Sequence, residues 1–319
     1  MAPAPEMNAP MPLKQGEVVV ISGGARGVTG DAAFAFARAF RSTLVLLGRS
    51  SLADSEPAWL QGLHTEAEIK KALFARLPGG SSPSAVEAGY RQMLAQREIR
   101  AQLERLGAAG AQAVYYSVDV RDAAAVARVL AEVRRRYGAI RGLVHGAGVL
   151  ADRRIEDKTE EQFDAVYGTK VTGLRNLLGA LANEKLKVIA LFSSYTGRFG
   201  RIGQVDYAAA NEVLNKIAQQ ESRRRPDCRV VSVNWGPWNG GMVTAGLRKI
   251  FEQEGVGLIE PGEGAAFLVR EICSEGKGEV EVLALAGAPR SAHTPVLHLT
   301  AGEQASVAFE REVSVKALP

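Results

Sequence analysis

Short apolar segments alternate with helical patterns along most of this sequence, and that alternation limits its fold more than any other feature. The apolar segments are rich in Val, Ile and Leu, as is typical of strands buried on both faces of a sheet. Parallel strands need long crossovers, which the intervening helical patterns supply. The sequence therefore predicts an α/β fold with a doubly wound, seven-stranded parallel sheet. Strands are expected at residues 17–22, 43–47, 113–118, 142–145, 188–192, 229–234 and 280–285.

The alternation is interrupted between the second and third predicted strands. Helical patterns cover residues 66–77 and 84–106, and residues 78–83 between them read PGGSSP, a composition typical of a loop. We therefore expect a helical insertion at about residues 52–105. Our preferred interpretation is that its helices cover the bare edge of the sheet. Two alternatives stay open, a substitute for a missing structural subdomain and a contact with neighbours in an assembly.

The two ends of the chain lack the pattern. Residues 1–16 hold four prolines and no periodicity, and residues 288–319 also lose the alternation, so both are interpreted as linkers. One domain, residues 17–287, remains between them. The N-terminus has neither the basic nor the apolar region of a signal peptide, and no run of about 18 apolar residues could form a transmembrane helix.

Composition and charge exclude further classes of protein. Only two cysteines are present, and the four histidines lack metal-ligand spacing, which predicts no disulfide scaffold, no metal site and a reducing cytoplasm. The net charge is +4, and the arginine runs at 134–136 and 223–225 come late in helical patterns, where cations suit the helix dipole. Nucleic acid is not expected, because no aromatic residues interleave with these runs. We interpret the two arginine runs as solvated helix ends, and the alternative is that they dock an acidic partner.

A glycine-rich turn, residues 22–30 with the sequence SGGARGVTG, lies between the first predicted strand and the first predicted helix. There the backbone can approach a pyrophosphate, and the helix N-terminus supplies N–H groups and positive potential. The pattern indicates a Rossmann-type dinucleotide site, with a plain tight turn as the alternative. The cofactor contacts expected from it are Gly23, Gly24, Arg26, Gly27 and Val28.

The end of the second strand carries Arg49, where NAD-binding sheets usually carry an acid that accepts from the ribose 2′-OH. Together with Arg26 it would neutralise a 2′-phosphate through forked hydrogen bonds. The pair favours NADPH over NADH, although either arginine alone could serve solubility. His145 is expected to be structural. Further cofactor contacts are expected after the third and fourth strands, at Asp119, Val120, Gly146, Ala147 and Gly148.

Candidate reactive residues follow the fifth predicted strand. Ser194 lies at its carboxyl end, where doubly wound sheets bind ligands, and Tyr207 starts the next helix. A tyrosine with a pKa of about 10 is a poor proton donor at pH 7 unless a nearby cation lowers that pKa. One helical turn later stands Asn211, not lysine, and Lys216 falls on the opposite face. Lys170 lies on a long helix that we expect at about residues 160–182, between the fourth and fifth strands. That helix should pack beside the helix of Tyr207, so Lys170 is the better candidate for the cation.

These residues resemble the short-chain dehydrogenase/reductase superfamily and, within it, the β-ketoacyl reductase domains of polyketide and fatty acid synthases. The signature FSS followed by GQxxYAAAN stands here at residues 192–194 and 203–211. In synthase ketoreductases the lysine and the asparagine are exchanged relative to other members, and Lys170 and Asn211 fit the exchanged order. The insertion and the string GVGLI at 255–259 resemble the iterative synthases that make polyunsaturated fatty acids.

The resemblance implies NADPH-dependent reduction of a 3-oxoacyl thioester on an acyl carrier protein, among neighbouring synthase domains, with residues 288–319 leading to a following domain. It implies that Tyr207 donates the proton and that Ser194 hydrogen-bonds the carbonyl oxygen. Lys170 would stabilise the tyrosinate and bind the nicotinamide ribose, and Asn211 would complete a proton relay. Implied contacts further along are those of Pro237 and Trp238 with the cofactor and of Met242, in a mobile lid, with the substrate.

The chain departs from the family in a few places. Thr29 replaces the third glycine of the superfamily's turn, so the first helix must pack differently. The acidic motif that accompanies a 3R-hydroxy product reads LAD here and keeps Asp152. Phe199 stands where a tryptophan would mark the opposite configuration, so a 3R product is expected.

Two other functions compete with this interpretation. One is a free-standing short-chain alcohol dehydrogenase acting on small ketones, against which the exchanged lysine and asparagine and the synthase-like ends argue. The other is a non-catalytic module that binds NADPH. Such modules commonly lose the tyrosine or the lysine, and this chain has both.

Overall fold

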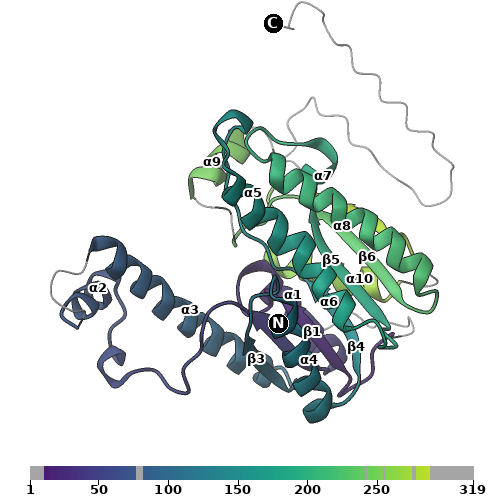
Figure 1. Ribbon diagram of the computed structural model, residues 1–319, viewed down its shortest axis with the longest axis horizontal. Coiled ribbons are helices and arrows are strands. Elements are labelled where there is room, and N and C mark those ends of the chain that lie inside the picture. The colour runs from purple at the N-terminus through teal and green to yellow at the C-terminus, as the bar shows by residue number, and fades with distance from the viewer. Residues whose placement is uncertain are drawn as a thin grey trace, which may run out of the picture.

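The computed structural model describes residues 11–76, 82–241, 243, 245–253, 256–274 and 278–287. Seven parallel strands form one sheet in the order β3-β2-β1-β4-β5-β6-β7, which confirms the predicted fold class (Figure 1). The predicted linker at 288–319, and residues 1–10 of the other, lie outside the described residues. The strands are β1 (Val18–Ser22), β2 (Thr43–Gly48), β3 (Ala113–Ser117), β4 (Ile140–His145), β5 (Val188–Ser194), β6 (Arg229–Trp235) and β7 (Glu281–Ala284).

The middle of the sheet is buried on both faces, as its apolar sequence predicts. Every residue of β1, β5 and β6 is buried, whereas those of the edge strand β3 are half-buried or exposed. β5 and β6 continue to Ser194 and Trp235, beyond their predicted ends, and these two residues are paired in register. The pairing holds Ser194 at the carboxyl edge of the sheet.

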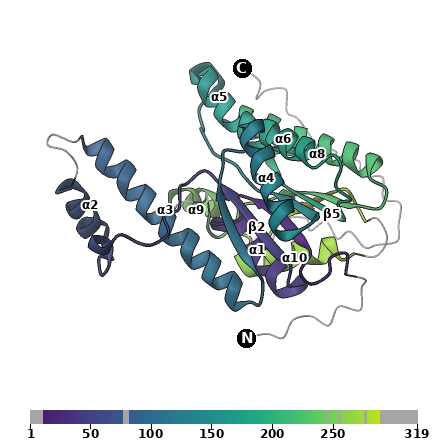
Figure 2. The same ribbon diagram turned by 60° about the horizontal axis from the view of Figure 1, so that its bottom comes forward.

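Helices cover both faces of the sheet (Figure 2). Helices α1 and α10 and the second half of α3 share one apolar core with the strands, and α4, α6 and α8 share the other. Side chains such as Asp122 before α4 and Thr159 before α5 cap the first N–H groups. The helices are α1 (Gly27–Phe40), α2 (Glu66–Phe74), α3 (Pro83–Ala108), α4 (Ala123–Tyr137), α5 (Glu160–Tyr167), α6 (Gly173–Ala180), α7 (Thr196–Phe199), α8 (Val205–Arg224), α9 (Ala245–Gln253) and α10 (Pro261–Ile272), with short 3₁₀ turns η1 (Ala58–Leu60) and η2 (Ile155–Asp157).

The long helix expected between the fourth and fifth strands is present but is not uniform. α5 and α6 are joined by η3 (Gly168–Thr172), one turn of π-helix. Such turns widen the helix locally and are frequent at functional sites. This one carries Lys170, and both η3 and α5 pack beside α8, the helix of Tyr207. The prediction that the two helices are neighbours is therefore confirmed.

The helical insertion is present, but our expectation that it covers the edge of the sheet is wrong. α2 and the first half of α3 project away from the sheet (Figures 1 and 2). The second half of α3 is the crossover helix between β2 and β3. At 26 residues α3 is about 39 Å long, more than the sheet can cover, so its first half extends beyond the core. That half packs with α2 and η1 around a separate apolar cluster of Leu60, Ile69, Leu73 and Val86.

The two arginine runs occupy helix ends, as predicted. Arg134 in the last turn of α4 pairs with Glu184, and Arg225 after α8 pairs with Glu221. Cations at these ends compensate the negative pole of the helix dipole. Among the described helices, none combines the length and the apolar character needed to cross a membrane.

Candidate active site

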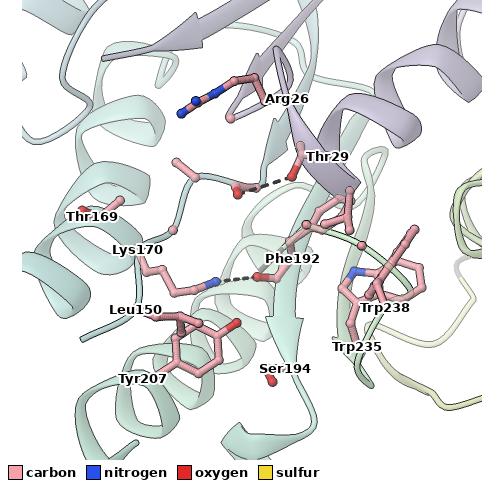
Figure 3. A pocket seen from close by; sticks show the side chains of 18 of the residues that line it. Arg26, Thr29, Leu150, Thr169, Lys170, Phe192, Ser194, Tyr207, Trp235 and Trp238 are labelled. Carbon is pink, nitrogen blue, oxygen red and sulfur yellow. Dashed lines mark hydrogen bonds between the residues drawn. The ribbon is translucent and has the colours of Figure 1, made fainter. Parts of the chain in front are cut away.

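A cavity of about 620 Å³ opens at the carboxyl ends of the strands. Its wall includes the glycine turn before α1, the segments after β2, β4, β5 and β6, and residues of α8 and α9. This is the edge at which doubly wound sheets bind ligands. Figure 3 shows side chains that line it. The predicted site residues that line the cavity are Gly23, Arg26, Gly27, Val28, Arg49, Val120, Gly146, Ala147, Gly148, Lys170, Ser194, Tyr207, Pro237 and Trp238.

The glycine turn after β1 lies directly against the segment that follows β4. Gly23 has a φ of +79°, and a Cβ atom there would stand 2.9 Å from the backbone nitrogen of Ala147. Only glycine allows that approach. Gly27, the first residue of α1, also lines the cavity, so the helix N-terminus forms part of the wall. A backbone cradle at a helix N-terminus fits the diphosphate of a dinucleotide.

The structure shows how Thr29 replaces the missing glycine. Its hydroxyl donates to the carbonyl oxygen of Gly146 at 3.4 Å. A Cβ atom at Gly146 would stand 2.3 Å from that hydroxyl oxygen, so the bulk of Thr29 is accommodated by a glycine on the opposite segment (Figure 3). The larger side chain at Thr29 and the missing side chain at Gly146 thus compensate each other.

The two arginines expected to bind a 2′-phosphate are among the residues that line the cavity. Arg26 and Arg49 both line the cavity, after β1 and β2 respectively. The Nη1 atom of Arg26 lies 3.3 Å from Oε2 of Glu98 on α3, and the two side chains are 49% and 56% exposed. Glu98 was not indicated by the sequence, because its position depends on how α3 packs on α1.

Two residues expected to bind the cofactor do not line this cavity. Gly24 serves close packing, since a Cβ atom there would stand 2.5 Å from Cγ2 of Ile21. The Asp119 carboxylate accepts hydrogen bonds from the Arg121 side chain, at 2.7 Å from Nη2, and they hold its pKa below the ordinary value. Arg121, two positions further along the chain, thus binds the carboxylate that we expected to line the cavity.

His145 is structural in its contacts. Its ring nitrogens lie 2.7 Å from the Ser22 hydroxyl and 2.9 Å from the Lys170 carbonyl oxygen. Burial lowers the pKa of His145 to about 3, so the ring is neutral at pH 7. The contacts tie β1, β4 and the π-turn together beneath the cavity.

Lys170, Ser194 and Tyr207 come from three elements and gather at one end of the cavity (Figure 3). Lys170 Nζ donates to the carbonyl oxygen of Phe192 at 2.9 Å and lies 5.2 Å from the centre of the Tyr207 ring. The Ser194 Oγ accepts from the Thr196 hydroxyl at 2.9 Å. A serine hydroxyl, a phenol and an ammonium group thus converge where a polar substrate atom could sit.

Burial sets the proton affinity of these groups. Loss of hydration lowers the pKa of Lys170 to about 7. Burial raises the pKa of Tyr207, and hydrogen bonds with Asn211 and Ser194 oppose that rise. Tyr207 therefore holds its proton at neutral pH, while the charge of Lys170 is sensitive to small changes in pH.

Asn211 lies behind Tyr207 rather than in the cavity wall. It is fully buried, and its Nδ2 donates to the backbone carbonyl of Tyr207 at 2.7 Å. Its Oδ1 has no hydrogen-bond partner among the described residues. A buried oxygen without a partner is costly, so it marks a place for a donor or a water molecule. Lys216, the other lysine considered, pairs with Glu212 on an exposed part of α8, which supports the choice of Lys170.

Two of the predicted substrate contacts, Asp152 and Phe199, do not line this cavity. The Asp152 carboxylate instead accepts from Gln204 Nε2 at 2.9 Å, just before α8. Phe199 ends α7 with 60% of its side chain exposed. Both side chains are exposed to solvent. Met242 lies outside the described residues.

A buried ion pair that the sequence did not indicate holds the start of α8. Lys158 Nζ lies 2.8 Å from Oδ2 of Asp206, and these side chains are 4% and 1% exposed. Lys158 also donates to the Ala151 carbonyl, and Oδ1 of Asp206 accepts from the backbone N–H of Tyr207. The pair thus joins the loop that carries Asp152 to the helix that carries Tyr207.

Aromatic side chains close another part of the wall. Trp235 and Trp238 line the cavity and pack edge to face, with ring centres 4.9 Å apart. Helix α9 lies within residues 242–255, which we expect to form the lid. The centre of its Phe251 ring lies 4.8 Å from the Arg201 guanidinium. That contact ties α9 to the segment between α7 and α8.

Comparison with protein families and relatives agrees with this geometry. A family model described as the KR domain matches residues 17–240. One polyunsaturated fatty acid synthase polypeptide of Thraustochytrium sp. is 41% identical over 281 residues, which are 85% of this chain and 10% of that protein. Polyketide synthase PksN of Bacillus subtilis is 29% identical over 237 residues, 72% of this chain and 4% of that protein. The chain thus spans a tenth or less of the length of these relatives.

Solved structures share the fold. A ketoreductase domain from the bacillaene assembly line matches with a TM-score of 0.67 and 28% identity, over 88% of this chain and 58% of that one. An alcohol dehydrogenase from Thermococcus sibiricus, complexed with 5-hydroxy-NADP, has a TM-score of 0.59 and 18% identity, over 87% of this chain and 99% of that one. The second likeness shows the fold alone.

Proposed function

This chain belongs to the KR domain family, and from that premise we propose that it reduces a 3-oxoacyl thioester to the 3-hydroxyacyl thioester within a multidomain synthase. The family consists of oxidoreductases of the short-chain dehydrogenase/reductase superfamily. The observation that carries the proposal is the grouping of Lys170, Ser194 and Tyr207 at one end of a cavity that also holds the glycine turn.

The chain's own residues would handle the proton. When bound, the nicotinamide cofactor would supply the hydride that adds to the carbonyl carbon of the substrate. The hydroxyls of Ser194 and Tyr207 would hydrogen-bond the carbonyl oxygen, where negative charge develops. Tyr207 gives its proton to that oxygen, which completes the alcohol, and charged Lys170 stabilises the resulting tyrosinate. The unpartnered oxygen of Asn211 would hold a donor through which Tyr207 regains a proton.

NADPH is the cofactor that the wall of the cavity supports best. Gly23, Gly27 and the N-terminus of α1 would hold the diphosphate, and Arg26 and Arg49 would bind the 2′-phosphate. Further contacts proposed are Val28, Val120, Gly146, Ala147, Gly148, Pro237 and Trp238, which line the same cavity.

The substrate would arrive on the arm of an acyl carrier protein, and other synthase domains would adjoin this one. The much greater length of the relatives supports that arrangement. We further propose a domain at residues 17–287 between two linkers, and a 3R product, which Asp152 and Phe199 favour by their motifs. A cytoplasmic location stays a prediction.

The test is an assay of NADPH oxidation with a 3-oxoacyl thioester on a pantetheine-like handle, with the configuration of the product resolved. We expect fast NADPH-dependent formation of the 3R alcohol and little activity on small free ketones. Equal activity on free ketones would instead favour a free-standing alcohol dehydrogenase. Binding of NADPH without turnover, even of the carrier-protein thioester, would favour a non-catalytic module.

A further inference from the structure

We propose that Glu98, supplied by the helical insertion, is a specificity-determining residue that weakens the preference for a 2′-phosphate over a 2′-hydroxyl on the cofactor. The inference rests on the proposed binding of the cofactor's adenosine ribose near Arg26 and Arg49. Part of the insertion would then act at the active site. Its position in the sequence, between β2 and β3, does not by itself suggest such a role.

Helix α3 packs against α1 through polar contacts, and this packing fixes the position of Glu98. Buried Gln102 donates from Nε2 to the carbonyl oxygen of Gly30 at 2.7 Å. One turn further, Arg105 pairs with Asp31 at 2.8 Å. Residues 98, 102 and 105 share one face of a helix. The same face that docks α3 onto the helix of the glycine turn therefore carries Glu98 to the cavity.

Glu98 stands out by its charge. It is the one carboxylate among the described residues that line the cavity, whose other charged residues are Arg26, Arg49, Lys170 and Arg201. Its Oε2 lies 3.3 Å from Nη1 of Arg26. An acid is thus paired with one of the two arginines proposed to receive the 2′-phosphate.

The carboxylate would treat the two cofactors differently. A 2′-phosphate carries close to two negative charges, so Glu98 would repel it and compete with it for Arg26. A ribose 2′-hydroxyl is neutral, and a carboxylate is the group that usually accepts from it in NAD-binding sheets. Glu98 therefore narrows the difference in affinity between NADPH and NADH.

The expected effect is modest because both side chains are about half exposed to solvent. Pairs between exposed charges are weak, and repulsion of the phosphate adds to their effect, so Glu98→Gln should raise the NADPH-to-NADH affinity ratio about threefold to tenfold. Glu98→Lys should raise the ratio further. Salt should reduce both effects, since the charges are screened.

The experiment is fluorescence titration of the protein with NADPH and with NADH, which measures affinity without turnover. Wild type, Glu98→Gln, Glu98→Lys and the control Glu104→Gln would be compared at low and at high salt. Glu104 is an exposed glutamate of the same helix that does not line the cavity. We expect the ratio to rise in both Glu98 variants and to stay unchanged in Glu104→Gln.

A ratio that is unchanged or lower in Glu98→Gln would overturn the inference, because Glu98 would then be neutral or would orient Arg26 for the phosphate. Arg26→Ala separates this failure from that of the proposed function. If Arg26→Ala lowers NADPH affinity while Glu98→Gln has no effect, only the role of Glu98 is wrong. If neither Arg26→Ala nor Arg49→Ala changes the ratio, the 2′-phosphate site itself is wrong, and the inference is overturned with it.

Discussion

The charged side chains in two parts of the site differ in their exposure to solvent. Near the reacting groups, the Lys158–Asp206 pair is 4% and 1% exposed, and Lys170 is also 4% exposed. Near the proposed phosphate site, Arg26 and Glu98 are 49% and 56% exposed. Buried charges interact strongly and cannot be left unpaired cheaply, whereas exposed charges are screened by water and salt.

This difference assigns different tasks to the two parts. The buried part keeps a phenol, a hydroxyl and an ammonium group in one arrangement, on which the rate of the proposed reduction would depend. The exposed part would adjust the affinity for the cofactor. Substitutions in the two parts should therefore differ both in the size of their effects and in the kinetic constant that they change.

The largest effect is expected at Tyr207. Without its hydroxyl, Tyr207→Phe loses the general acid, so kcat should fall by about 10²–10⁴-fold. The fold and the affinity for NADPH should stay unchanged, since the ring still fills its place beside Lys170. Steady-state kinetics together with a binding titration would check this. A rate near that of the wild type would remove Tyr207 from the mechanism.

Breaking the buried ion pair should cost stability. Lys158→Met leaves the Asp206 carboxylate buried without its cation, which should lower the free energy of unfolding by about 3–5 kcal/mol. Urea denaturation would measure that loss. The control is Arg91→Met, which breaks the exposed pair with Glu87 and should cost less than about 1 kcal/mol.

A second variant separates stability from catalysis at the same pair. Lys158→Met combined with Asp206→Leu should regain most of the stability, because no uncompensated charge stays buried. It still removes the hydrogen bond from the Tyr207 N–H to Asp206, so we expect its kcat to stay below that of the wild type. Full recovery of kcat would mean that the pair serves the fold alone.

The charge of Lys170 should appear in the pH profile. Its pKa of about 7 means that the side chain is charged below pH 7 and loses its charge as the pH rises. Because the charged form stabilises the tyrosinate, kcat for reduction should fall with rising pH, towards about a tenth of its pH 6 value at pH 8. Lys170→Arg should move the fall to higher pH. A fall at the same pH in Lys170→Arg would assign it to another group.

The smallest of these effects is expected at the phosphate site. Arg49→Ala should raise KM for NADPH about tenfold and leave KM for NADH and kcat nearly unchanged, since it removes charge-assisted hydrogen bonds to the 2′-phosphate alone. The increase should shrink at high salt. Equal increases for NADPH and NADH would show that Arg49 contacts a part that the two cofactors share.

Local patterns explain why much of the fold was predictable. The central strands of the sheet are short apolar segments, and their burial follows from residues adjacent in sequence. Helix α4 begins after the capping residue Asp122 and helix α10 begins at Pro261, so the sequence marks both starts. Strand ends were less predictable, because pairing with a neighbour decides them, as at Ser194 and Trp235.

The position of the candidate site was predictable to a similar degree. The glycine turn, Ser194 and Tyr207 stand at element boundaries that the sequence marks, and the helical period excludes Lys216. The orientation of single side chains was not predictable. The Asp119 carboxylate accepts from Arg121 and that of Asp152 from Gln204, and neither hydrogen bond follows from the local sequence pattern.

The sequence by itself determined the order of strands and helices along the chain, the position of the glycine turn and the types of reactive residue. Only the tertiary structure decided which charges meet. Lys158 and Asp206 are 48 positions apart, and Arg26 and Glu98 are 72 apart. Periodicity is a property of neighbouring residues, whereas the partner of a distant charge depends on how whole helices pack. The insertion illustrates this, since its helical pattern was evident and its direction was set by where α3 docks on α1.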